Sequence, residues 1–153
     1  MAKKNIIIAI LAVLVVVLVG ASACLLSKQS KSDEVLTSKV FTGEKWQWTK
    51  TVMNNDEVIT PRDSEAFSIT FTEDGKLNGT TDCNNFFGAY TETGDDLSFG
   101  PFGSTKMYCE GSQELEFTKS LGEVEKFLFT ESGDLVLTLK FDSGSIIFEK
   151  SNL

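Results

Sequence analysis

The side chains best suited to covalent chemistry in this chain are three cysteines, Cys24, Cys83 and Cys109. Cys24 lies within an apolar N-terminal segment, which leaves Cys83 and Cys109 as the one pair in the polar remainder. We predict a disulfide between these two residues, with two buried free thiols as the alternative. Because the bridge would close a loop of about 26 residues, the chain-entropy model gives a stabilisation of roughly 3 to 4 kcal/mol.

Residue types for acid–base catalysis or metal binding are scarce. The chain contains no histidine, which is the usual general base near neutral pH and the commonest ligand for zinc and copper. Asp95 and Asp96 are adjacent in a Gly-Asp-Asp turn sequence, where carboxylates usually point into water. No phosphate-binding loop, nucleophile elbow or spaced set of metal ligands is present in the sequence. We therefore expect a protein that is not an enzyme and that needs no metal or cofactor.

The charge balance excludes several classes of partner. The chain has a formal net charge of -8, and Lys3 and Lys4 precede the apolar segment. Residues 27–153 therefore hold 12 of the 14 basic residues and all 22 acidic ones, a net charge of -10. This charge repels the phosphates of nucleic acids and anionic lipid headgroups. We expect no nucleic-acid partner.

The first 27 residues predict a membrane anchor. Lys3 and Lys4 are followed by residues 6–26, which carry no charge and are long enough to cross a bilayer core as a helix. Because basic residues stay on the cytoplasmic side, the rest of the chain is expected to face outward. The alternative is a lipoprotein signal, since the small residues 21–23 precede Cys24. In that case the chain would be cleaved before Cys24, and Cys24 would be acylated.

The remainder divides into a tether over residues 28–43 and a β-rich domain over residues 44–153. The tether is polar and mixed in charge, without a sustained hydrophobic period. In the domain, alternation predicts strands over residues 45–53, with Trp46 and Trp48 on one face, and around Ile69. A late strand is predicted from Leu135 to Phe141, followed by a turn and a return strand over residues 146–150.

Turn sequences and one helix complete the predicted architecture. Glu73-Asp74-Gly75 and Gly94-Asp95-Asp96 are expected to close two hairpins. One short helix is predicted over residues 112–123, with Ser112 as its cap and Phe117, Leu121 and Val124 on its apolar face. Many short strands with a single helix favour an antiparallel barrel, closed or half-open, because closure removes exposed strand edges.

The sequence GTTDCNNFFGAY, residues 79–90, resembles the META domain family, also called the heat-inducible lipoprotein family. A Thr-x-Met-x-Cys segment follows at residues 105–109, and the similarity extends over roughly residues 45–150. The chain departs from the family where Asp82 replaces a glycine, which leaves the geometry of the turn open. The motif residues that carry the resemblance are Cys83, Asn84, Phe86, Gly88, Tyr90, Thr105, Met107 and Cys109.

The resemblance implies a lipocalin-like β-barrel with one helix and a stress-linked role in the cell envelope without a settled enzymatic activity. We interpret the chain as a membrane-anchored interaction module with a protein partner in the envelope. In this interpretation the turn and the segment around Met107 and Tyr108 would form a recognition edge. Its apolar anchors would be Phe86, Phe87 and Phe102. The motif residues can equally be structural, because Asn84 can bind local backbone and Gly88 can take a conformation closed to other residues.

Two alternatives for function stay open at this stage. A barrel could carry a small apolar ligand in its cavity, and an interior filled by Phe67, Phe71, Leu137 and Phe148 would argue against that. A surface loop tied by a disulfide could instead inhibit an envelope protease.

Overall fold

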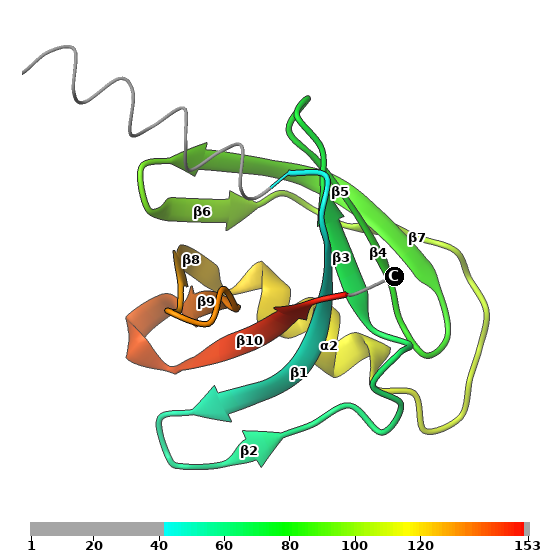
Figure 1. Ribbon diagram of the computed structural model, residues 1–153. Helices are drawn as coiled ribbons and strands as arrows, with labels where there is room; N and C mark the ends of the chain where they lie inside the picture. Colours follow the sequence, from blue (N-terminus) through cyan, green and yellow to red (C-terminus); the bar gives the residue numbers. More distant parts are fainter. Residues whose placement is uncertain (1–41, 152–153) are drawn as a thin grey trace, which may run out of the picture. The chain divides into compact units, whose positions relative to one another are not determined.

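The computed structural model describes residues 42–151, which form ten strands and two short helices (Figure 1). The predicted anchor over residues 1–27, Cys24 and nearly all of the predicted tether lie outside the described residues. Within residues 42–151, no helix combines the length and the apolar character that a membrane crossing needs. In chain order the elements are β1 (Lys45–Met53), β2 (Val58–Ile59), β3 (Ser68–Phe71), β4 (Lys76–Thr80), β5 (Asn85–Thr93), β6 (Asp96–Phe99), β7 (Gly103–Ser104), α2 (Glu114–Gly122), β8 (Val124–Phe129), β9 (Leu135–Leu139), the 3-10 helix η1 (Lys140–Asp142) and β10 (Gly144–Lys150).

Eight of the strands close into an antiparallel barrel, which confirms the predicted fold class in its closed form. The hydrogen-bonded order is β10-β9-β8-β6-β5-β4-β3-β1, and β1 then pairs with β10 from Trp46 opposite Lys150 to Met53 opposite Gly144. β2 and β7 lie outside this ring, paired with β1 and β5 respectively. The barrel therefore joins the first and last strands of the domain directly.

The weakest seam of the barrel lies between β6 and β8. These strands share a single residue pair, Asp96 opposite Lys126. The Nζ of Lys126 lies 3.1 Å from Asp95 Oδ2 and 3.2 Å from Asp96 Oδ1, and its hydrogen bond holds the pKa of Asp95 below its usual range. The two adjacent carboxylates are thus exposed, and they make ion pairs across the seam.

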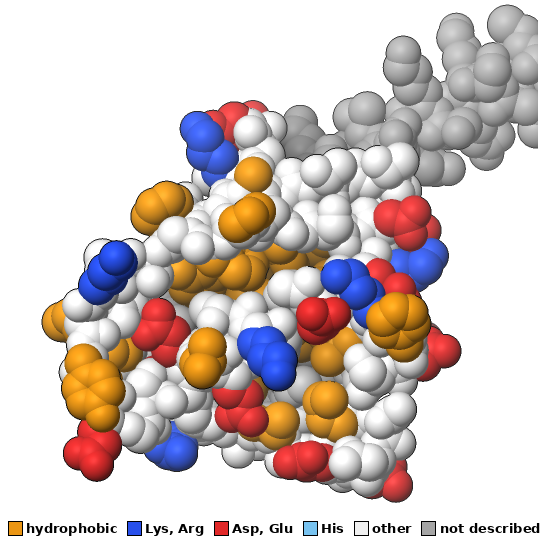
Figure 2. Space-filling model, turned by 180° about the vertical axis from the view of Figure 1, so that it is seen from behind, with side chains coloured by type: hydrophobic (Ala, Val, Ile, Leu, Met, Phe, Trp, Pro, Cys, Tyr) orange, Lys and Arg blue, Asp and Glu red, His pale blue; other side chains and the backbone are white. Residues whose placement is uncertain are grey.

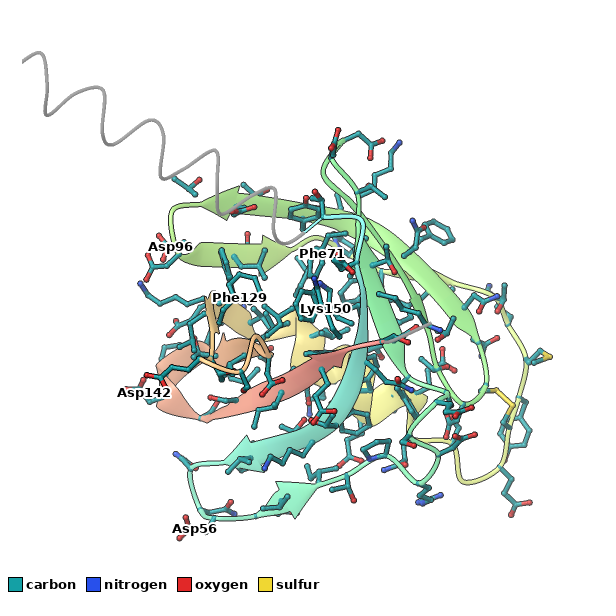
Figure 3. All side chains as sticks on the ribbon, in the orientation of Figure 1. Asp56, Phe71, Asp96, Phe129, Asp142 and Lys150 are labelled. Carbon is teal, nitrogen blue, oxygen red and sulfur yellow. A yellow bond between two sulfur atoms is a disulfide. The ribbon has the colours of Figure 1, made fainter. Side chains whose placement is uncertain are left out.

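Large apolar side chains fill the interior of the barrel. Trp46 and Trp48 face inward from β1, as the alternation predicts, and α2 contributes Phe117, whose ring centroid lies 5.0 Å from that of Trp48. The four residues named as evidence against a ligand carrier, Phe67, Phe71, Leu137 and Phe148, are all fully buried in this core. Figure 3 labels Phe71 among the side chains inside the barrel. The filled interior argues against an apolar ligand inside the barrel.

The helix is shorter than predicted, and the strand after it was missed. α2 spans Glu114–Gly122, whereas Val124, predicted on the apolar face of the helix, begins β8. The register of β8 against β9 shifts between Val124 and Lys126. This irregularity interrupts the two-residue alternation by which a strand is recognised in sequence.

The predicted strand ending at Phe141 stops earlier in the structure. β9 ends at Leu139, and Phe141 lies in η1 with φ of 60° and its side chain 93% exposed. Asp142, labelled in Figure 3, follows with φ of 52°. The tight turn into β10 therefore uses the left-handed conformation at two residues that are not glycine. A turn beginning at Asp142 was predicted, but the part that Phe141 takes in it was not.

Candidate functional site

A disulfide ties the loop after β7 to the turn between β4 and β5. Cys83 and Cys109 are bonded, with an S–S distance of 2.07 Å and 5.8 Å between their Cα atoms, as the cysteine count predicted. The bond is visible in yellow in Figure 3, between that turn and the long loop leading to α2. Two segments far apart in the sequence are thereby held together at one side of the barrel.

The side chain of Asn84 holds the same loop in place by hydrogen bonds. It is only 6% exposed, and its Oδ1 accepts hydrogen bonds from Thr105 Oγ1 at 2.7 Å and from the Met107 backbone N–H at 2.8 Å. Its Nδ2 donates to the Met107 carbonyl at 3.1 Å and to Glu114 Oε2 at 2.8 Å. Both donors and both acceptor positions of the amide are used. Asn84 therefore positions the loop and has no capacity left for a ligand.

The unusual Asp82 supports the start of α2. Its Oδ1 accepts a hydrogen bond from Ser112 Oγ at 2.6 Å, and its Oδ2 accepts one from the Gln113 backbone N–H at 2.9 Å. Ser112 Oγ in turn accepts from the Glu114 N–H, but the N-cap residue of α2 is Gln113 and not Ser112 as predicted, because the helix begins at Glu114. Because the amino end of a helix carries partial positive charge, a carboxylate there is stabilising. The departure from the family glycine thus has a structural role, and Asp82 adopts no positive φ.

Two of the three predicted aromatic anchors pack against the core. Phe86 is buried, with its ring centroid 5.4 Å from that of Phe102, which is itself half-buried. Phe87 alone of the three is exposed, at 60%. The recognition edge as predicted is therefore wrong for Phe86, because β5 turns alternate side chains inward, and for Phe102, because it packs against the core from the segment after β6.

Gly88 and Tyr90 also serve packing. Gly88 has no positive φ, contrary to our interpretation, but a Cβ placed there would lie 2.8 Å from the ring of Phe102. The Tyr90 hydroxyl donates to the Thr72 carbonyl at 2.9 Å, and burial raises the pKa of this phenol. Its ring meets Phe71 edge to face. Both residues hold β5 against its neighbours.

A surface groove of about 530 Å³ lies between α2 and the loop after β7. Its apolar part is exposed to an unusual degree, with Met107 65%, Leu115 78% and Tyr108 91% accessible. Figure 2 shows one face of the molecule, on which hydrophobic side chains lie interspersed with acidic and basic ones. The lining residues are Cys83, Ser104, Met107, Tyr108, Cys109, Ser112, Glu114, Leu115 and Thr118.

The structure places Met107, one of the motif residues, in the lining of the groove, together with Leu115, which the sequence reasoning missed. Leu115 lies off the stripe formed by Phe117 and Leu121, so it is the one leucine of α2 that faces away from the core. Its position off the apolar stripe was the feature of the sequence that could have identified Leu115 as an exposed residue. Residues 42–151 contain no group of three or more acidic or cysteine side chains placed to hold a metal ion.

These features define a class of protein, a closed eight-stranded antiparallel barrel with one helix and a loop tied to the barrel by a disulfide. Residues 39–152 match the META domain family, and the chain belongs to that family. No curated protein matches the chain by sequence.

Two solved structures share the fold. A protein from Burkholderia xenovorans, solved by NMR, aligns with a TM-score of 0.64 and 18% identity, covering 77% of this chain and 88% of that one. A DUF4847 family protein from Bacteroides vulgatus aligns with a TM-score of 0.58 and 16% identity, covering 76% and 99% respectively.

Proposed function

We propose that this chain is a binding module of the cell envelope, anchored in the membrane by residues 1–27, with a non-catalytic role in envelope maintenance under stress. The uncharged segment behind Lys3 and Lys4 supports the anchor and its orientation. Membership of the META domain family is consistent with such a role, which the sequence resemblance implied.

The observation that carries the proposal is the Cys83–Cys109 disulfide. Disulfides persist in oxidising compartments and are rare where glutathione and thioredoxin keep thiols reduced. A bond that holds a surface loop in place therefore supports a domain on the outer side of the membrane.

Binding is favoured over catalysis by the way the polar motif residues are used. The side-chain hydrogen bonds of these residues, Asn84, Thr105 and Tyr90, are made to other groups of the domain itself. The exposed residues beside them, Met107 and Tyr108, are apolar or aromatic, as is usual for residues that anchor a protein partner.

The test combines topology with mass. Protease added outside spheroplasts should degrade the domain. Protease that has access only to the cytoplasmic face of the membrane, as in inside-out vesicles, should leave it intact. Intact mass of the membrane-extracted chain should equal the full sequence less two hydrogens, with no alkylation of Cys83 or Cys109 before reduction. Removal of residues 1–23 with added acyl mass would make Cys24 the anchor instead. A protected domain with two alkylatable thiols would refute the outward placement.

Inhibition of an envelope protease is a second candidate, favoured by one observation. Tyr108 projects from a loop that the disulfide and Asn84 both restrain, and restrained loops lose little freedom on entering a protease cleft. Incubation with a chymotrypsin-like protease tests this. An inhibitor should suppress hydrolysis of a small substrate while the bond after Tyr108 stays intact, and rapid cleavage there without inhibition would dismiss the idea.

A further inference from the structure

We propose that the groove between β7 and α2 binds an extended, positively charged peptide segment of another envelope protein. This inference deepens the binding role proposed above and rests on it. Three features of the groove specify the occupant: a free strand edge, an apolar wall and a carboxylate.

The free strand edge belongs to β7. In its ladder with β5, the Thr105 N–H donates to the Asn85 carbonyl at 3.0 Å, and Gly103 lies opposite Phe87. The intervening pair, Ser104 opposite Phe86, is then the non-hydrogen-bonded kind of an antiparallel ladder, so the Ser104 N–H and carbonyl point away from β5.

This edge is open in the part of the chain that the structure describes. β7 pairs only with β5 there, and Ser104 lines the groove. Unpaired strand edges are templates for an added strand, and peptides recognised in this way bind in extended conformation. The groove thus offers main-chain hydrogen bonds that an extended peptide can use and that a compact ligand cannot.

The apolar wall faces the same space. Leu115 contributes to it from α2, and Met107 and Tyr108 contribute to it from the loop, which forms the rim. The rim is held by the disulfide at Cys109 and by the hydrogen bonds of Asn84, so little ordering entropy is lost when a peptide enters. A peptide with apolar side chains on one face would cover this wall.

The carboxylate selects the sign of the peptide's charge. Glu114 lines the groove, and only its Oε2 has a partner among the described residues, the Nδ2 of Asn84. Residues 104–118 carry three carboxylates against one basic residue, Lys106, and residues 42–151 as a whole hold 20 acidic and 9 basic residues, a net charge of -11. The field of the domain therefore attracts a cationic segment and repels an anionic one.

The first experiment measures peptide binding by fluorescence anisotropy. The full chain in nonionic detergent micelles is titrated into a fluorescein-labelled peptide of eight alternating lysines and valines. Saturable binding is expected, and the matching glutamate–valine peptide should bind at least about tenfold more weakly because its charge is reversed. A lysine–valine peptide with N-methyl groups on alternate residues should also lose about tenfold, because it cannot donate to the strand edge. Equal binding of the methylated peptide would overturn the strand-edge assignment.

Matched variants locate the site. Glu114→Gln keeps an oxygen that can accept from Asn84 while removing the charge, and Leu115→Ser changes an exposed side chain, so both should fold. Each is expected to weaken the lysine–valine peptide by about tenfold. Glu116→Gln, exposed on the same helix outside the groove, should change binding less than about twofold. Equal effects of the two glutamates would show attraction to net charge alone and refute the site.

The outcome is separable from that of the proposed function. The titration uses purified chain and does not depend on where the domain lies in the cell, whereas the spheroplast experiment reads topology and does not depend on the groove. Absence of saturable binding by an outward-facing domain would refute the peptide site alone.

Discussion

Replacing Asn84 with alanine removes only a short side chain, but we expect it to destabilise the domain strongly. The substitution removes four hydrogen bonds at a side chain that is 6% exposed. Each such bond contributes about 1 kcal/mol net, and the groups left without a partner add a desolvation cost where water cannot reach them. Because Glu114 and Thr105 lie near the surface and can recover water, we expect a loss of about 2 to 3 kcal/mol rather than the full sum.

The assay is urea unfolding of the full chain in detergent micelles, followed by the fluorescence of Trp46 and Trp48, both of which are buried. Asn85→Ala is the matched control, because Asn85 is the adjacent asparagine, is exposed and changes the same atoms. It should alter the free energy of unfolding by less than about 0.5 kcal/mol. If the two alanine variants unfold at the same urea concentration, the reasoning that Asn84 fastens the loop is refuted.

Three further predictions follow from packing, titration and backbone conformation. Gly79→Ala should cost about 1 to 3 kcal/mol by overpacking, since its Cβ would lie 2.2 Å from Phe86 Cζ, and calorimetry that shows no fall in melting temperature would contradict this. Because the pKa of Tyr90 is raised, the folded state keeps the phenol proton to a higher pH than the unfolded state does, so the free energy of unfolding should fall as pH rises above the ordinary tyrosine value of 10.0. Comparing urea midpoints at pH 9 and pH 11 tests this, and Tyr90→Phe should show a smaller fall. Phe141→Asn should stabilise by about 0.5 to 1 kcal/mol, because asparagine tolerates the positive φ and the exposed ring has little packing to lose; an unchanged or lowered midpoint would argue against strain there.

Strands with regular alternation could be predicted from the sequence closely. Residues 45–53 form β1 with the predicted bounds, and the turns at Gly75 and Gly94 close the expected hairpins with positive φ. In these places local pattern and tertiary burial agree, so the period of the apolar residues is enough.

The errors fall where tertiary structure overrides that pattern. The register shift in β8 conceals its alternation, and the late strand was predicted to extend to Phe141 because the spacing of this residue continues that of Leu135 to Leu139. Closure of the barrel could not be decided either, because pairing of β1 with β10 joins segments about 100 residues apart and leaves no local signal.

The candidate site was predictable only in part. The disulfide followed from the cysteine count, but the groove that Met107 lines depends on how α2 lies against the loop. The buried Asn84 and Phe86 could not be distinguished from exposed recognition residues by type alone, because asparagine and phenylalanine serve in both roles.

The pairing of β1 with β10 also bears on the order in which the domain can fold as the chain is made. β1 leaves the ribosome first among the strands, yet the partner that closes its far edge is the final strand, over Gly144–Lys150. The barrel therefore cannot close until β10 has been synthesised, and contacts of such long sequence separation slow folding further. Late closure of this kind is compatible with the outward placement proposed above, which requires the chain to cross the membrane unfolded.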